Sequence, residues 1–321
     1  MHLCDDILAL IGNTPLVRVN NLDTGPCTLW LKLESQNPGG SIKDRIALKM
    51  IEAAEESGQL RPGDTIIEAT AGNTGLGLAL VAALKGYKLK IVMPDKMSRE
   101  KVYSLQGLGA EVLMTRSDVC KGHPEYYQDV AARLAKETGG YYINQFCNPN
   151  NVAAHYEGTA PEIWEQLRGQ VDAFVCGVGS GGTLSGVGRF LKERKPNAEI
   201  VLADPEGSVL APFIQTGTMP EAGSWVVEGI GEDFVPDICD LSLVDKAYTI
   251  TDAESLNTAR RLVAAEGIMG GSSTGTLVAA ALRYCREQTQ AKNVVTLVCD
   301  TGNRYLSKMY NDDWMKEKGF L

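Results

Sequence analysis

The segment Asn37-Pro38-Gly39-Gly40-Ser41-Ile42-Lys43-Asp44-Arg45 joins an alternating apolar run at residues 29–33 to a helix-period run at residues 46–54. Its first four residues predict a turn, because glycine relieves steric limits and proline fixes its own φ. Ser41 then occupies a helix N-cap position, with Asp44 three residues later as a shortened capping-box acid. The segment is therefore predicted to start a helix shortly after a strand.

Lys43 falls in the first turn of that helix. Unpaired backbone N–H groups and the positive end of the helix dipole disfavour a second positive charge there, which favours a lowered lysine pKa. A partly neutral amine can form a Schiff base. Taken alone, the segment is more typical of an ordinary exposed lysine at a helix start, so the rest of the sequence has to decide between the two interpretations.

The composition is that of a soluble globular protein. Its 321 residues, 44% hydrophobic and 22% charged, suffice for one large domain or two ordinary ones. A net charge of -9 argues against nucleic acid or an anionic membrane as the main partner. The longest apolar run, at residues 76–84, is too short to cross a bilayer, and Asp5 and Asp6 give the N-terminus the wrong charge for a secretory signal.

Cysteine and histidine are scattered along the chain. The 8 cysteines include no C-x-x-C pair and several lie in apolar runs, which favours buried free thiols in a reducing compartment. We therefore expect a cytoplasmic protein. His2, His123 and His155 are far apart in sequence, so we expect neither a metal site nor a Ser-His-Asp triad.

Short β-rich segments alternate with helix-period segments along most of the chain. Strands are predicted at 64–68, 88–93, 111–115, 171–178, 199–203 and 293–299, and helices at 75–86, 98–109, 125–137, 155–168, 184–194, 252–266 and 276–288. Such alternation predicts parallel sheets with helices on both faces. Because the pattern restarts after residues 148–151 and loosens over 207–240, we expect two α/β units, with a ligand cleft at the carboxyl ends of their strands.

Three turns rich in small residues precede predicted helices. The first, Thr70-Ala71-Gly72-Asn73-Thr74-Gly75, brings hydroxyls, an amide and a helix N-terminus together, which suits a carboxylate. Ordinary N-capping by Asn73 or Thr74 explains it equally well. The third, Gly270-Gly271-Ser272-Ser273-Thr274-Gly275, also fits a plain loop.

The second turn, Gly177-Val178-Gly179-Ser180-Gly181-Gly182-Thr183, is predicted to bind an anion. Glycines allow close backbone approach, and the following helix N-terminus offers free N–H donors to a phosphate. The turn also matches the dinucleotide fingerprint G-x-G-x-x-G, with Asp204 ending the next strand, so a nucleotide-binding dehydrogenase is an alternative. A tight turn without any ligand is a third interpretation.

Taken together, these motifs resemble the fold-type II pyridoxal-phosphate (PLP) enzymes of the cysteine synthase and cystathionine β-synthase family. The likeness starts at Ile11-Gly12-Asn13-Thr14-Pro15-Leu16 and covers nearly the whole chain. It implies an α/β fold of two doubly wound parallel-sheet domains, as in the tryptophan synthase β subunit. The resemblance assigns residues 35–147 to the smaller domain, and residues 1–34 with 148–321 to the larger one. It also implies a homodimer and pyridoxal 5′-phosphate as the cofactor.

The resemblance assigns roles to individual residues, with Lys43 as the Schiff-base lysine that also removes the substrate Cα proton. Asn73 is similar to the residue that binds the 3′ oxygen of the cofactor, and Ser272 to the partner of the pyridine nitrogen. The phosphate cradle implied by the family consists of Gly179, Ser180, Gly181, Gly182 and Thr183. The substrate-binding residues implied by it are Thr70, Ala71, Asn73, Thr74, Gln145 and Gly229. A hydroxyl at the ring nitrogen makes the cofactor a milder electron sink, which favours loss of a β-substituent.

Three segments resemble the cystathionine β-synthase branch of the family, at residues 204–208, 227–234 and 312–320. This branch implies β-replacement of serine or O-acetylserine by homocysteine to give cystathionine, with hydrogen sulfide production as a possible side activity. The alternative within the family is a cysteine synthase that uses O-acetylserine and sulfide. A partner-binding relative without activity is disfavoured, because Lys43, Asn73 and Ser272 are all present.

The sequence departs from the family pattern at three points. Ala71 replaces the serine of the usual T-S-G-N-T-G loop, which makes an activated donor such as O-acetylserine plausible beside serine. The turn at 270–275 has one residue more than the usual G-G-S-x-G, which leaves Ser273 as an alternative to Ser272. Without an upstream heme-binding extension or a C-terminal regulatory pair, we expect neither heme nor adenosylmethionine control.

Overall fold

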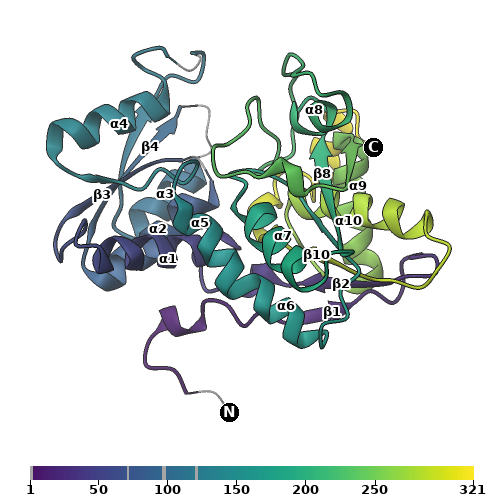
Figure 1. Ribbon diagram of the computed structural model, residues 1–321. Coiled ribbons are helices and arrows are strands. Elements are labelled where there is room, and N and C mark those ends of the chain that lie inside the picture. The colour runs from purple at the N-terminus through teal and green to yellow at the C-terminus, as the bar shows by residue number, and fades with distance from the viewer. Residues whose placement is uncertain (1–2, 71, 96–98, 120–121) are drawn as a thin grey trace.

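The structure is a computed structural model that describes residues 3–70, 72–95, 99–119 and 122–321. The chain forms two α/β units that lie side by side, each around its own sheet (Figure 1). The smaller unit has a 4-stranded sheet in the order β5-β4-β3-β6, in which the three strand pairs are parallel. Its elements are α1 (Lys43–Glu56), β3 (Thr65–Ala69), α2 (Asn73–Lys85), β4 (Lys88–Pro94), α3 (Arg99–Gly107), β5 (Glu111–Thr115), α4 (Tyr127–Thr138) and β6 (Tyr141–Tyr142).

The larger unit has a 6-stranded sheet in the order β1-β2-β10-β7-β8-β9, where β1 and β2 are antiparallel and the other described pairs are parallel. Its strands are β1 (Leu16–Arg18), β2 (Thr28–Lys32), β7 (Ala173–Cys176), β8 (Glu199–Pro205), β9 (Lys246–Ile250) and β10 (Asn293–Leu297). Its helices are α5 (Pro149–Ala154), a π-helix (His155–Thr159), α6 (Ala160–Gln166), α7 (Gly182–Arg194), α8 (Leu210–Thr216), α9 (Asp252–Glu266), α10 (Ser272–Arg286) and α11 (Asp312–Glu317).

Alternate residues of the smaller sheet face helices on opposite sides. Ile66 and Ile91 belong to the buried cluster that includes residues of α1 and α2. Ile67 and Val92 belong instead to the cluster with Ala131 of α4. Since both faces of these strands are covered, near-continuous apolar strands and a parallel sheet are expected together. The predicted parallel sheets with helices on both faces are thus confirmed.

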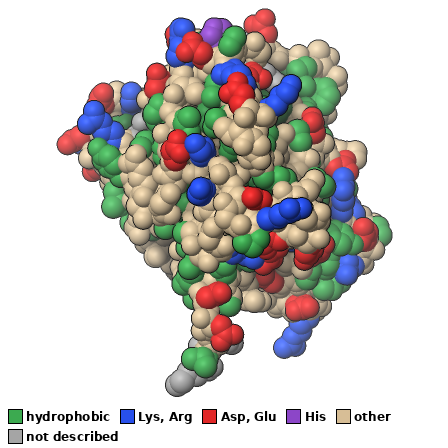
Figure 2. Space-filling model, turned by 90° about the vertical axis from the view of Figure 1, so that its left-hand side faces the viewer, with side chains coloured by type: hydrophobic (Ala, Val, Ile, Leu, Met, Phe, Trp, Pro, Cys, Tyr) green, Lys and Arg blue, Asp and Glu red, His purple; other side chains and the backbone are tan. Residues whose placement is uncertain are grey.

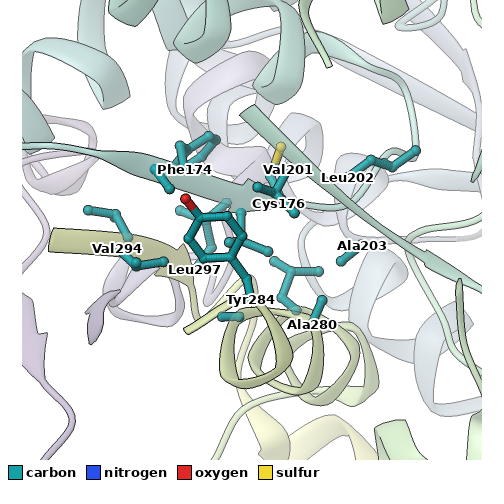
Figure 3. Packing of buried hydrophobic residues seen from close by; sticks show 14 of the residues in the cluster. Phe174, Cys176, Val201, Leu202, Ala203, Ala280, Tyr284, Val294 and Leu297 are labelled. Carbon is teal, nitrogen blue, oxygen red and sulfur yellow. The ribbon is translucent and has the colours of Figure 1, made fainter. Parts of the chain in front are cut away.

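Part of the core of the larger unit lies between its sheet and α10. Figure 3 shows the Tyr284 ring of α10 among side chains of β7, β8 and β10, including Phe174, Val201 and Val294. These four side chains are fully buried. Each such burial contributes about 1.5–3 kcal/mol, so this packing fixes the strand ends on which the site is built.

Several elements differ from the sequence-based expectation. The predicted bounds of β5 and α9 match the observed ones, but β1, β6, β9, α5, α8 and α11 were not predicted. The expected Ser41 N-cap is wrong, because α1 begins at Lys43 with Ile42 as its N-cap and Ser41 forms a β-bridge with Asp300. The Ser41 Oγ still accepts the N–H of Lys43, at 3.2 Å. The limits of the two predicted domains stay a prediction.

Charged side chains of both signs are scattered over the exposed surface of the smaller unit. Figure 2 shows acidic and basic side chains interspersed on this face, without a gathering of one sign. Within the described ranges, no helix is long and apolar enough to cross a membrane. Among the same residues, no group of three or more His, Cys, Asp and Glu side chains could hold a metal ion.

Candidate active site

A cavity of about 240 Å³ lies between the two units, where several strands end. Thr70 follows β3, Gly177 follows β7 and Cys299 lies just beyond β10, as expected for a site at the carboxyl ends of parallel strands. The predicted site residues that line it are Lys43, Thr70, Asn73, Thr74, Gln145, Gly179, Ser180, Gly181, Thr183 and Gly229. Gly182 and Ser272 are not among its lining residues, and Ala71 lies outside the described residues.

Lys43 enters the cavity from the first residue of α1. The segment before it is tied to the end of β10, because Ile42 donates its N–H to the Cys299 carbonyl at 2.9 Å and Thr301 donates to the Gly40 carbonyl at 3.0 Å. Burial lowers the pKa of Lys43 from its ordinary value, and the nearby Cys299 and Glu232 only partly oppose this shift. The site therefore makes the neutral amine, which a covalent bond to a carbonyl carbon requires, easier to form than on an exposed lysine.

The glycine-rich turn before α7 is packed too closely to accept side chains. A Cβ on Gly179 would lie 2.6 Å from the Gly229 carbonyl oxygen, and one on Gly182 would lie 1.9 Å from Asn151 Oδ1. Gly181 has a φ of +90°, which favours glycine. The turn thus presents backbone and the N-terminus of the 13-residue helix α7 to the cavity, which suits a phosphate group.

Buried polar side chains form hydrogen bonds with the glycine-rich turn before α7. His155 Nε2 lies 3.2 Å from Thr183 Oγ1, and its Nδ1 lies 3.0 Å from Thr159 Oγ1. Burial lowers the pKa of His155 well below its ordinary value, so the imidazole is neutral. Asn151 Nδ2 donates to Ser180 Oγ at 2.9 Å. Sequence reasoning considered His155 only for a metal site or a Ser-His-Asp triad, expected neither, and missed this role because its partners are 4 and 28 residues away.

The opposite wall is formed by the turn before α2. Thr74 Oγ1 donates to Gln145 Oε1 at 2.7 Å, and the Gly72 N–H donates to Thr70 Oγ1 at 3.1 Å. Asn73 Nδ2 donates to Asp300 Oδ2 at 2.8 Å, which fixes the amide at the cavity edge. Hydroxyls, amides and the helix N-terminus therefore converge, as a carboxylate-binding loop requires.

The two candidate serines lie in different surroundings at the start of α10. Ser272 Oγ accepts the N–H of Glu228 at 2.9 Å, so its own O–H proton remains available for an acceptor. Ser273 lines the cavity, and its side chain hydrogen-bonds with Cys299. The role implied for Ser272 therefore stays a prediction, and Ser273 remains its alternative.

Asp204 does not serve a nucleotide ribose in this fold. Its Oδ2 accepts the N–H of Ala211 in α8 at 2.8 Å, and its side chain is buried outside the cavity lining. The acidic residue of the dinucleotide fingerprint thus caps a neighbouring helix instead of facing the glycine-rich turn.

A comparison with protein families decides between the remaining interpretations. Residues 7–300 match the family described as "Pyridoxal-phosphate dependent enzyme". The chain belongs to this family. Pyridoxal 5′-phosphate is therefore its cofactor, and the dehydrogenase interpretation of Gly177, Gly179, Gly182 and Asp204 is wrong.

Curated relatives of this chain include cystathionine β-synthases. The one from Apis mellifera is 46% identical over 320 residues, which cover 98% of this chain and 63% of the relative. The one from Mus musculus is also 46% identical, over 98% of this chain and 57% of the relative. The chain thus spans about three fifths of the length of the curated relatives that it matches.

Two solved structures share the fold over their whole length. A hydrogen sulfide-producing enzyme from Fusobacterium nucleatum is 42% identical, with a TM-score of 0.87, over 95% of this chain and 100% of that one. An O-ureido-L-serine synthase is 35% identical, with a TM-score of 0.90, over 98% of this chain and 100% of that one. The predicted fold-type II architecture is confirmed.

The residues around the cavity fit the cofactor. The glycine turn before α7 is a cradle that side chains would fill, and it suits the cofactor phosphate. Lys43 supplies a buried amine with a lowered pKa for the aldehyde carbon. The serines of α10 offer a hydroxyl donor, which suits a pyridine nitrogen acceptor. These three features lie around one cavity, on different secondary-structure elements.

Exchanging each serine separately will identify the partner of the ring nitrogen. We expect Ser272→Ala to lower turnover about fivefold, because one lost hydrogen bond costs about 1 kcal/mol. It should also shift the visible absorption of the bound cofactor, whereas Ser273→Ala should change both quantities less. Steady-state rates and absorption spectra of the two variants provide the measurement. The opposite ranking would transfer the role to Ser273.

Proposed function

We propose that this chain catalyses a PLP-dependent β-replacement that joins serine or O-acetylserine to homocysteine and yields cystathionine. The observation that carries the proposal is the convergence of Lys43, the turn before α2 and the turn before α7 around one cavity. The curated cystathionine β-synthases, 42–46% identical over nearly the whole of this chain, support the choice of acceptor.

The cofactor, when bound, withdraws electrons from the amino-acid Cα and so makes its proton acidic and its β-substituent easier to lose. The residues of this chain do the rest. Lys43 takes the Cα proton, because burial lowers the pKa of its amine and so makes the neutral form easier to reach. Thr70, Asn73 and Thr74, with Gln145 beside them, bind the substrate carboxylate through hydroxyl, amide and backbone N–H donors. Residues of both α/β units line the cavity.

A competition assay tests the proposal. Purified protein with PLP receives serine or O-acetylserine together with equal concentrations of homocysteine and sulfide, and mass spectrometry measures the products. We expect cystathionine to predominate. Predominant cysteine would favour the cysteine synthase alternative instead, and absence of any sulfur-containing product would contradict β-replacement by a thiol.

Two further expectations belong to this proposal. The solved structure of a hydrogen sulfide-producing enzyme at 42% identity supports hydrogen sulfide release as a side activity, from cysteine and homocysteine. The expected homodimer and cytoplasmic location rest on the family resemblance and on the scattered free thiols, respectively.

A further inference from the structure

One acidic side chain in the cavity has no role in the mechanism described above. Glu232 lies in the segment between α8 and β9, and its side chain is only partly exposed. It lines the 240 Å³ cavity around Lys43 and also an adjoining cavity of about 480 Å³, which Lys101 and Lys308 also line. Glu232 therefore lies where the inner site meets the space next to it.

The Glu232 backbone is fixed, while its carboxyl group is unengaged. Its N–H donates to Ser208 Oγ at 3.0 Å, and its carbonyl accepts from Ser208 Oγ at 3.2 Å and from the N–H of Val209 at 3.0 Å. No hydrogen bond or ion pair joins its carboxyl group to the residues that the structure describes. Glu228, by contrast, forms ion pairs of 2.6 Å with both Lys101 and Lys308. A positioned carboxyl group that needs no protein partner can act on a substrate.

The surroundings keep this carboxyl group largely protonated near neutral pH. Burial raises the pKa of Glu232 to about 8; the negative charges of Asp233 and Asp204 act in the same direction, whereas Lys43 opposes them. The other titratable side chains that interact with it are Tyr126, Tyr127 and Cys239. A carboxylic acid with a pKa close to the working pH is suited to general acid–base catalysis.

The other titratable groups that line the inner cavity are less suited to protonate a leaving group. Lys43 is committed to the Cα proton, and burial raises the pKa of the Cys299 thiol to about 12. Position 71 carries an alanine, which has no hydroxyl with which to hold the β-substituent. Glu232 is thus the described cavity residue with both a transferable proton and no other partner.

We propose that Glu232 is a catalytic acid–base residue that protonates the departing β-hydroxyl of serine and later takes a proton from the incoming thiol. The inference rests on the proposed β-replacement. The Cβ–O bond breaks with its electron pair on oxygen, the Glu232 proton joins that oxygen, and water leaves. The thiol sulfur then bonds to Cβ while its proton returns to the Glu232 carboxylate. Protons and electrons balance over the cycle, and no further reactant is needed.

The test compares two donors that differ in their need for a proton. Serine must release hydroxide unless its departing β-oxygen is protonated, whereas O-acetylserine releases acetate, which leaves without a proton. Single-turnover absorbance changes of the holoenzyme are measured with each donor in the absence of thiol, so that only loss of the β-substituent is observed. We expect Glu232→Gln to slow loss of the β-substituent from serine about 100-fold or more, and its loss from O-acetylserine only a few-fold.

Matched variants and a second readout make the test specific. Glu221→Gln removes an exposed carboxyl group of the same segment that lines neither cavity, and it should leave both rates unchanged. Glu232→Asp keeps a carboxyl group and should retain a greater share of the serine rate. Carbon-13 NMR of glutamate-labelled protein should show a carboxyl resonance that titrates near pH 8 and is absent from Glu232→Gln. Wild type and Glu232→Gln should bind alanine, which has no leaving group, with equal affinity, and this comparison checks that the variant site is intact.

The possible outcomes separate the two proposals. A wild-type rate with serine in Glu232→Gln, or an equal loss with both donors, would overturn the assignment of Glu232 alone. A wild-type protein that is inert with both donors would overturn the proposed function itself. A loss confined to serine, with the NMR titration assigned to Glu232, would support the inference.

Discussion

Replacement of Lys43 by alanine is expected to lower the rate of β-replacement by about 10³-fold or more. The proposed function gives this lysine two tasks that no neighbouring group shares. Its Nζ would hold the cofactor covalently, and the same atom would take the Cα proton of the substrate. Burial lowers the pKa of Lys43, so this amine loses its proton more readily than an exposed lysine does.

The Lys43→Ala prediction has a spectroscopic and a kinetic readout. The purified variant should lose the visible absorption of covalently held cofactor, and steady-state cystathionine formation should fall with it. Lys49→Ala is the matched control, because Lys49 lies on the same helix but forms a partly exposed 2.7 Å ion pair with Glu157. Such a pair contributes at most about 1 kcal/mol to stability, so this control should keep both the colour and the rate. A Lys43→Ala protein with wild-type turnover would contradict the assignment.

The fold and most of the candidate site follow from local sequence signals. Parallel strands that are buried on both faces have continuous apolar runs, so β3, β4, β7 and β8 were predictable from the sequence. The glycine turns and Lys43 were predictable too, because each function depends on residues that are adjacent in sequence and on the helix that follows them.

The missed features depend instead on contacts between distant parts of the chain. The segment at 207–240 lacks a helical or strand-like hydrophobic period. Its backbone is held in place by contacts with distant residues, such as the hydrogen bonds from the N–H groups of Val226 and Val227 to Asp252. Glu232 belongs to this segment, so no local pattern places its carboxyl group beside Lys43. The choice between Ser272 and Ser273 also needs the structure, because one helical residue turns a side chain by about 100°.

Replacement of Arg45 by methionine is expected to lower the free energy of unfolding by about 3–5 kcal/mol. Arg45 follows Lys43 by two residues and is nearly fully buried, as is Glu34. Its Nε lies 2.6 Å from Glu34 Oε2, and its Nη1 lies 2.7 Å from Glu162 Oε1. Methionine keeps much of the apolar volume but leaves the Glu34 carboxylate buried without its cation. An unpaired buried charge strongly destabilises the folded state.

Chemical denaturation measures this loss, and pH gives it a second signature. Burial alone would raise the pKa of Glu162, but its bonds with Arg45 and Lys32 outweigh this and lower the pKa to about 2, from an ordinary value of 4.5. A carboxyl group with a lowered pKa stabilises the folded state above its unfolded pKa, and this stabilisation is lost as pH falls. The difference between wild type and Arg45→Met should therefore shrink from about pH 4.5 towards pH 2.

A second arginine with two carboxylate partners offers a matched control. Arg116 pairs with Asp118 at 2.8 Å and with Glu125 at 3.3 Å, but all three side chains are at least half exposed. Arg116→Met should therefore cost less than about 1 kcal/mol at neutral pH. Equal losses of unfolding free energy in Arg45→Met and Arg116→Met would show that burial does not set the strength of the Arg45 network. A large loss for Arg45→Met alone would show that this network anchors the start of α1, and thereby the helix that presents Lys43 to the cavity.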